Sequence, residues 1–382
     1  MADRPSYLDF AATTPTDPRV AGLVMDLMVT EFGNAGSRTH EFGAVAKRTI
    51  EQARAQVADV VGADPSEVIF TSGATESDNL ALLGLADHGL TSGRRHIVTT
   101  AVEHKAVLEP LDALAERGFR IDHVAPDASG AVAAGAVLDA VRADTLLVSV
   151  MHVNNETGIR QPIADIASGL LERSADHVFL HTDAAQSFGK ELEDLRTQRI
   201  DLISVSGHKL LAPKGIGALV ARRRDRRRPP LQPLMFGGGQ ERGLRPGTQP
   251  VGLIAGLGLA AELAVSEWTE RRAAAMDIRR QLQAVVDRLG AATNGDPELG
   301  VPHILNISVP GIDSEAAILA LRGVVAISNG SACTSSSYEP SHVLTAMGLD
   351  GDRRREAIRL SWGPGAIMPD AGRMVAALQA LL

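Results

Sequence analysis

Short apolar runs alternate with amphipathic segments over residues 44–221, and this alternation limits the chain to few folds. The amphipathic segments at 44–61, 105–117 and 163–173 have the periodicity of helices. The apolar runs have the length of strands and lie at 68–70, 96–100, 120–124, 145–151, 177–181, 202–206 and 218–221. Strands that alternate with helices favour right-handed βαβ units. The pattern therefore predicts an α/β fold with a mostly parallel, seven-stranded sheet.

The remainder of the chain has a different pattern, in which a long helical stretch at 252–289 precedes shorter elements. Those elements are strands near 304–308, 324–327 and 358–361, a helix near 314–321 and a final helix. A chain of 382 residues exceeds what one hydrophobic core commonly supports. We therefore expect a large domain over residues 16–255 and a smaller α+β domain formed by residues 1–15 and 256–382.

Composition and charge disfavour several classes of protein. Hydrophobic residues make up 45% of the chain and charged residues 22%, as in ordinary globular enzymes. We expect neither a membrane span nor a signal peptide, because the long apolar runs that both require are missing. The prediction is a cytoplasmic enzyme without a membrane partner. The net charge of -8 disfavours direct binding of nucleic acid.

The run 222–228 is a local exception to the acidic balance, since it places arginines on both sides of Asp225. It follows an expected strand, so we interpret it as a solvated loop. A binding patch for an acidic partner is the alternative interpretation.

Cys333 is the only cysteine, which rules out an internal disulfide and a multi-cysteine metal site. We expect no metal. Without context, a lone cysteine is most simply read as a small buried hydrophobe. The residues around it, 328–337, are small and polar instead, and they predict an accessible loop.

Two segments have the composition of a cofactor site. Lys209 follows an expected strand in the run 206–209, and a lysine amine attacks an aldehyde only when it is deprotonated. Taken by itself, it is more simply read as a solvated surface lysine. Residues 71–76 follow another strand and precede a helix, which suits a phosphate held by backbone N–H groups. The simpler reading of that turn is a helix N-cap.

Asp183 lies at the end of the expected strand that precedes the strand leading to Lys209. An acid there could hydrogen-bond a pyridine nitrogen and keep it protonated, although a helix cap is the plainer explanation. The carboxyl ends of parallel strands share one edge of the sheet, where ligands bind. Together, Asp183 and Lys209 are the arrangement expected of a pyridoxal-phosphate (PLP) site.

The chain resembles the cysteine desulfurases of the NifS/IscS type, in the class V aminotransferase group of fold-type I PLP enzymes. The resemblance runs nearly end to end, from residues 7–15 to residues 358–361. It rests on the motifs FTSGATESDN (70–79), EHKAVL (103–108), VSVMHVNNETG (148–158), SGHKLLAPKGIGAL (206–219), GGGQERGLRPGT (237–248) and NGSACTSSSYEPSHVL (329–344). An ordered set of this length is not a chance match.

The resemblance implies a role for individual residues. Lys209 would bind PLP covalently, His104 would stack on its ring and exchange protons, and Cys333 would be the catalytic thiol. The other implied cofactor contacts are Asp183 to the ring nitrogen, Gln186 to the ring hydroxyl, Asn155 against the ring, and Ala74, Thr75, Ser206 and His208 to the phosphate. Thr248 would reach the phosphate of a second subunit, which implies a homodimer. Arg359 would bind the substrate carboxylate, with Asn34 as a second contact.

The implied activity converts L-cysteine to L-alanine and leaves the sulfur on Cys333 as a persulfide. An acceptor protein of unknown identity would then take the sulfur for iron–sulfur assembly, DNA phosphorothioation or tRNA thiolation. Two alternatives remain: a class V aminotransferase or lyase for another amino acid, and a non-catalytic sulfur-trafficking partner. The first would not need Cys333 on a small-residue loop, and the presence of all the cofactor residues argues against the second.

Three departures from the family pattern stand out. Residues 362–365 read Trp-Gly-Pro-Gly where the family has a segment like Gly-Arg-Phe-Thr, so an arginine is missing near the substrate carboxylate. The segment 34–37 lacks the usual proline after Asn34. The sequence stops at Leu382, directly after the final helical run. This ending leads us to expect a specialised sulfur destination, as in the DndA-like branch that serves DNA phosphorothioation.

Overall fold

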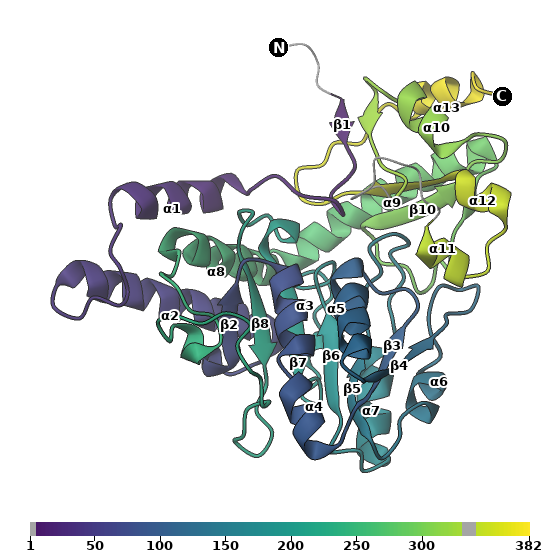
Figure 1. Ribbon diagram of the computed structural model, residues 1–382. Helices are drawn as coiled ribbons and strands as arrows, with labels where there is room; N and C mark the ends of the chain where they lie inside the picture. Colours follow the sequence, from purple (N-terminus) through teal and green to yellow (C-terminus); the bar gives the residue numbers. More distant parts are fainter. Residues whose placement is uncertain (1–4, 331–340) are drawn as a thin grey trace.

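The computed structural model describes residues 5–330 and 341–382, so the predicted sulfur carrier Cys333 lies outside the described residues. A seven-stranded sheet lies at the centre of the larger part of the molecule (Figure 1). Its strands, in spatial order, are β2 (Val68–Thr71), β8 (Gly217–Ala221), β7 (Leu202–Ser206), β6 (Phe179–Asp183), β5 (Thr145–Ser149), β3 (His96–Thr100) and β4 (Arg120–Val124). Within this sheet β8 alone runs in the direction opposite to the other strands, so the prediction of a mostly parallel sheet is confirmed.

Helices cover both faces of the sheet. They are α1 (Pro18–Val29), α2 (Glu41–Val61), α3 (Ala74–Leu83), α4 (Ala86–Ser92), α5 (Lys105–Glu116), α6 (Ala134–Asp139), α7 (Ile163–Glu172) and α8 (Val251–Ser266). Successive strand residues point to opposite faces, so Phe70 packs in the core with α2, α7 and α8, whereas Ile69 packs with α3 and α5. Burial on both faces explains why these strands are apolar runs without alternation.

A smaller α+β unit packs beside the sheet. Its antiparallel strands are β9 (Ala292–Thr293), β10 (Ile304–Ser308) and β12 (Ala357–Ser361), and β1 (Ser6–Tyr7) pairs with β11 (Val325–Ala326). Its helices are α9 (Trp268–Leu289), α10 (Ser314–Ala320), α11 (His342–Ala346), α12 (Gly351–Arg355) and α13 (Ala371–Gln379). Leu8 joins the core of this unit, while Ala264 of α8 packs in the core of the sheet. The division into domains at residue 255 stays a prediction.

The long helical stretch predicted at 252–289 is two helices, α8 and α9, that meet at an angle of 75°. Glu267 lies between them and forms ion pairs with Arg19 and Arg271. The indole N–H of Trp268 donates to the Lys190 carbonyl at 2.8 Å. These contacts hold the bend in place. No proline or glycine occurs at the bend to indicate it in the sequence. No single helix in the described part of the chain has the length and apolar character to cross a membrane, although α8 and α9 would meet both criteria if taken together.

The arginine run after β8 is only partly a solvated loop. Arg222 is 2% exposed, and its guanidinium donates to the carbonyls of Leu195 and Val61 at 2.8 and 2.5 Å. Arg224 pairs with the buried Asp201. These two arginines therefore join the end of β8 to neighbouring segments. Only residues 225–228 are exposed, as the solvated-loop prediction requires.

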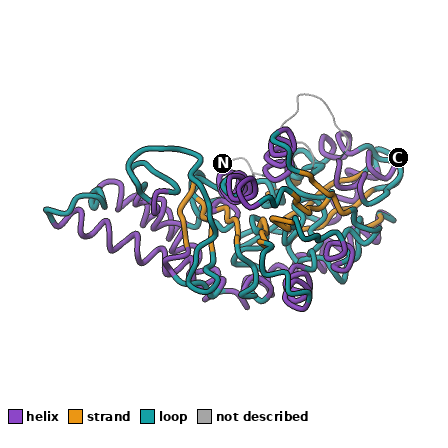
Figure 2. The backbone as a smooth tube through the Cα atoms, turned by 60° about the horizontal axis from the view of Figure 1, so that its bottom comes forward, coloured by secondary structure: helices purple, strands orange, loops and turns teal. Residues whose placement is uncertain are grey.

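The loop between α1 and α2 projects from the body of the molecule (Figure 1, Figure 2). Met28, Phe32 and Phe42 at this projection are exposed, and the rings of Phe32 and Phe42 stack with centroids 5.5 Å apart. Phe236, in the long segment between β8 and α8, is 88% exposed. The adjacent exposed rings of Phe32 and Phe42 indicate a protein contact surface.

The described part of the chain also contains four short 3₁₀ helices. They are η1 (Pro65–Glu67), η2 (Asp194–Arg196), η3 (Gly207–Lys209) and η4 (Glu241–Gly243). Of these, η3 directly follows β7 and brings Lys209 to the carboxyl edge of the sheet.

Candidate active site

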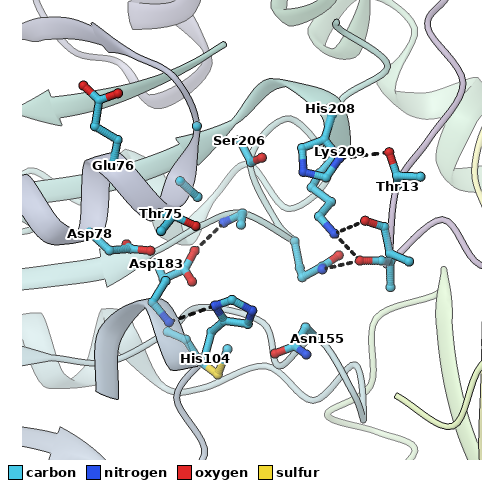
Figure 3. A pocket seen from close by; sticks show the side chains of 18 of the residues that line it. Thr13, Thr75, Glu76, Asp78, His104, Asn155, Asp183, Ser206, His208 and Lys209 are labelled. Atoms are coloured by element: carbon cyan, nitrogen blue, oxygen red, sulfur yellow. Dashed lines mark hydrogen bonds between the residues drawn. The ribbon is translucent and has the colours of Figure 1, made fainter. Parts of the chain in front are cut away.

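A pocket of about 590 Å³ opens at the carboxyl edge of the sheet, beneath the segment that follows β1. Its size lies within the range of small-molecule sites. Residues from distant parts of the sequence meet here because parallel strands end at the same edge. The predicted residues that line it are Ala74, Thr75, His104, Asn155, Asp183, Gln186, Ser206, His208, Lys209 and Arg359 (Figure 3).

The N-terminus of α3 forms the part of the pocket predicted to hold a phosphate. Gly73 is the N-cap, and no side chain caps the helix, so the first backbone N–H groups remain available. A Cβ on Gly217 would lie 2.6 Å from the Cα of Gly73, so β8 can pass this turn only without a side chain. Open N–H groups and the positive end of the helix dipole favour an anion here.

Ser206 and His208 approach the same place from the end of β7. The Nδ1 atom of His208 lies 3.0 Å from the Thr13 hydroxyl, which fixes the orientation of the ring. Burial, together with the nearby charge of Lys209, lowers the pKa of His208 to about 4. A neutral imidazole can therefore donate or accept a hydrogen bond at this wall without adding a charge.

Asp183 ends β6 and is 6% exposed. Its Oδ1 accepts the backbone N–H of Ala185 at 2.8 Å, which orients the carboxyl toward the pocket (Figure 3). Burial raises the pKa of Asp183, and the positive charges of His104 and Lys209 oppose that rise. A cation bound against this carboxyl would stabilise its ionised form further.

Lys209 and His104 face the same space from different elements. The Lys209 ammonium donates to the carbonyls of Ala11 and Ala12, the latter at 2.7 Å. His104 is the N-cap of α5, and its Nδ1 accepts the Ala106 N–H at 3.1 Å. Burial lowers the pKa of His104, and the negative charge of Asp183 opposes that shift. Both groups are thus positioned by the backbone.

Arg359 belongs to β12 and is 2% exposed. It donates to the Asn155 carbonyl and to the Asp9 carboxylate, each at 2.8 Å, whereas its Nε has no partner among the described residues. Nearby, Trp362 occupies the position where the family pattern departs. This indole is buried and donates to the Ala275 carbonyl of α9 at 2.9 Å, so it acts as a packing residue.

Two predicted residues lie outside the pocket. Asn34 is exposed on the projecting loop, where its Oδ1 accepts the Gly36 N–H at 2.8 Å. Thr248 is exposed in the segment before α8. A single chain therefore does not bring either residue to Arg359 or Lys209, and their predicted roles stay predictions. Cys333, as noted, lies outside the described residues.

Several lining residues were not predicted from the sequence, among them Thr13, Asp78 and Lys214. Asp78 had a usable signal, because it is one of two polar residues on the buried side of α3. A carboxyl on the buried face of a helix needs a partner or a proton. Thr13 and Lys214 had no such signal, since their approach depends on how separate segments pack.

The whole chain is similar to known proteins. The sequence profile of the family described as "Aminotransferase class-V" matches residues 6–366. The chain is 46% identical to proteins named cysteine desulfurase IscS from Salmonella arizonae and Escherichia coli, over 94% of this chain and 88% of each relative. The chain therefore belongs to the class-V aminotransferase family, whose enzymes depend on PLP. Within that family, these relatives bear the name of one activity, cysteine desulfuration.

Solved structures agree with this assignment. DndA from Streptomyces lividans is 52% identical, with a TM-score of 0.82 over 94% of this chain and 100% of DndA. A NifS-like protein is 35% identical, with a TM-score of 0.89 over 99% of this chain and 98% of its own. SspA in complex with cysteine is 38% identical, with a TM-score of 0.82 over 95% of this chain and 100% of SspA.

The pocket has the chemistry that PLP requires. A buried acid, an amine and an open helix N-terminus stand where a ring nitrogen, an aldehyde and a phosphate would be bound. Gln186 donates to the Ala11 carbonyl at 3.0 Å, but its Oε1 is buried without a partner among the described residues. A buried acceptor of this kind is costly unless a ligand donates to it, and the ring hydroxyl of PLP is such a donor.

Proposed function

We propose that this chain is a PLP-dependent cysteine desulfurase, which converts L-cysteine to L-alanine and keeps the sulfur as a persulfide on Cys333. The observation that carries the proposal is the meeting of Lys209, Asp183 and His104 in one pocket with the uncapped N-terminus of α3. The identity to cysteine desulfurases over most of the chain supports it. The small, polar sequence around Cys333 supports the role of an accessible thiol.

Bound PLP supplies an electron sink for the negative charge that develops on the substrate α-carbon. Lys209 would hold the cofactor covalently and, once released, would carry a proton to and from the substrate carbon. Asp183 would hold the ring nitrogen, and Gln186 the ring hydroxyl. His104 would lie against the ring with Asn155. Ala74, Thr75, Ser206 and His208 would hold the phosphate.

Arg359 would bind the substrate carboxylate, and its two protein contacts fix the guanidinium before substrate binds. The Cys333 thiolate would then attack the substrate sulfur. The new S–S bond forms as the carbon–sulfur bond breaks, and the electron pair of that bond remains with the carbon fragment. Protonation of this fragment gives alanine.

Replacing Cys333 with Ser tests the proposal. The Cys333→Ser protein should retain the visible absorbance of lysine-bound PLP and bind cysteine, yet lose persulfide formation and alanine production. Lys209→Ala is the matched control, and it should lose that absorbance. Full alanine production by Cys333→Ser would refute the persulfide role and favour another PLP activity. Purified wild-type protein that binds no PLP would favour a non-catalytic role.

We infer a homodimer as the working form. Support comes from the exposed apolar side chains Met28, Phe32, Phe42 and Phe236, which a second subunit would cover. Thr248 and Asn34 are exposed and lie outside the pocket of their own chain, as expected of residues that serve a neighbouring subunit. In this arrangement Thr248 would complete the phosphate site of the partner.

For the sulfur acceptor we propose a protein of a dedicated pathway, with DNA phosphorothioation as the first candidate. The support is the 52% identity to DndA, which exceeds the 46% identity to the IscS proteins. Incubation with sulfur-labelled cysteine and a cell extract of the source organism, followed by identification of the labelled macromolecule, tests this choice. Label found chiefly in iron–sulfur proteins or in tRNA would overturn it.

A further inference from the structure

Asp78 is a fully buried carboxyl that the proposed chemistry does not use. It lies on α3, is 0% exposed, and lines the pocket next to Asp183 (Figure 3). Among the described residues neither of its oxygens has a well-formed hydrogen bond. An ionised carboxylate in such a place would lack the donors that stabilise its charge.

The basic group nearest to Asp78 is His181, with its Nε2 atom 3.5 Å from Oδ1. This imidazole is also 0% exposed, and it is fixed between two hydroxyls: Ser149 at 2.8 Å from Nδ1 and Ser204 at 3.0 Å from Nε2. Burial lowers the pKa of His181 to about 3, so the ring is neutral in the working range of an enzyme. His181 is therefore a neutral neighbour of Asp78 and does not neutralise a negative charge on it.

The charged groups around Asp78 differ from those around Asp183. Asp78 lies near the acids Asp183 and Glu103, and a negative charge on either acid disfavours a negative charge on Asp78. Asp183 faces His104 and Lys209, which favour its negative charge. Two neighbouring buried carboxyls cannot both ionise cheaply. The negative charge therefore belongs on Asp183 and the proton on Asp78.

We propose that Asp78 is a positioning residue, a protonated carboxyl that lies beside His181 and next to Asp183. It fills the space below Asp183 with an uncharged polar group and confines the negative charge to the carboxylate that faces the cofactor ring. This inference rests on the proposed PLP function for its purpose. The protonation state of Asp78 does not depend on that function, because residues of this chain determine it.

The first test uses apoprotein and infrared spectroscopy. Near neutral pH, the wild-type spectrum should contain the C=O stretch of a protonated carboxyl that Asp78→Asn removes. Glu103→Gln is the matched control, because Glu103 is a second buried carboxyl and should account for a separate component. An unchanged carboxylic-acid band in Asp78→Asn would overturn the proposal. If that variant does not fold, Asp78→Ser should remove the same component, and its failure to do so counts equally against the proposal.

The second test uses holoprotein and the pH titration of cofactor absorbance. Because Asn is uncharged like a protonated acid, Asp78→Asn should keep the wild-type midpoint, whereas Asp183→Asn should shift or abolish the transition. A midpoint displaced by about one pH unit or more in Asp78→Asn would mean that Asp78 carries charge and would overturn the proposal. A wild-type protein without cofactor absorbance would refute the PLP function, while the infrared result would still decide the state of Asp78.

Discussion

Arg359 is held by two hydrogen bonds before any substrate carboxylate reaches it. One goes to the Asn155 carbonyl and one to Asp9, so the planar guanidinium is fixed, and its Nε has no partner among the described residues. A lysine could supply one positive charge but not several hydrogen-bond donors in one plane. The side chain thus contributes orientation as well as attraction.

Arg359→Lys should raise the KM for cysteine at least about tenfold, which corresponds to about 1.4 kcal/mol of lost binding. Cofactor absorbance should be unchanged, since none of the predicted PLP contacts is removed. Steady-state kinetics measure the effect. Arg355→Lys is the control, because Arg355 is exposed and forms an ion pair with Asp352 near the surface. Equal KM values for the Arg359 variant and the wild type would contradict the assigned role.

Glu103 makes stability depend on pH. Burial raises the pKa of this carboxyl from 4.5 to about 8, so the folded protein keeps a proton that the unfolded chain loses. The stabilisation is complete below about pH 4.5 and is lost as the pH rises through 8, at about 1.4 kcal/mol per pH unit. Denaturant unfolding should show the wild type losing stability relative to Glu103→Gln over this window. A constant difference between the two proteins would mean that Glu103 has the same pKa in the folded and the unfolded protein.

At the scale of elements, the crossing of β8 over the start of α3 shapes the phosphate site. In Gly217→Ala the new methyl would lie 2.4 Å from the Val205 carbonyl and 2.6 Å from Gly73, and both are backbone atoms. Overpacking should cost about 1–3 kcal/mol of stability and should weaken PLP binding. Fluorescence titration of the apoprotein with PLP measures the second effect.

Gly22→Ala in α1 is the control for that substitution, because nothing lies within 4 Å of its added Cβ. It should leave PLP affinity unchanged and should slightly stabilise the helix. If Gly217→Ala binds PLP as tightly as this control does, the close approach of β8 is not important for the site.

Elements that a local sequence pattern determines were predictable, whereas those that depend on distant contacts were not. The strands β3, β4, β7 and β10 have the predicted bounds because local apolar runs specify them. By contrast β6 begins two residues later than predicted, at Phe179 rather than at His177. The bend between α8 and α9 was missed, because Glu267 and Trp268 make contacts that lie far away in sequence.

At the scale of the molecule, the fold and most of the pocket followed from motifs at strand ends. The pocket residues that were missed, such as Thr13, lie there because the segment after β1 crosses the sheet edge. No local pattern records such a crossing. The buried position of Arg222 was also missed, since a run of arginines looks solvated until its carbonyl partners are known.

The inferred dimer predicts a measurable effect at the exposed Phe236. Phe236→Asp should weaken self-association by about 2–4 kcal/mol if the ring is a central contact, without changing the fold of the monomer. Analytical ultracentrifugation over a range of concentrations measures this. Ile367→Asp replaces another exposed apolar side chain, 73% exposed in the smaller unit, and should have no effect. Unaltered association of the Phe236 variant would show that this segment lies outside the interface.

The reversed direction of β8 has a further consequence. Its first residue, Gly217, lies against Gly73 of the pocket, and its last residue leads into the arginine run, so that run emerges at the opposite edge of the sheet (Figure 1). The exposed arginines 226–228 therefore lie far from the mouth of the pocket. An enzyme attached to a negatively charged support through these arginines would keep its substrate entrance turned toward the solution.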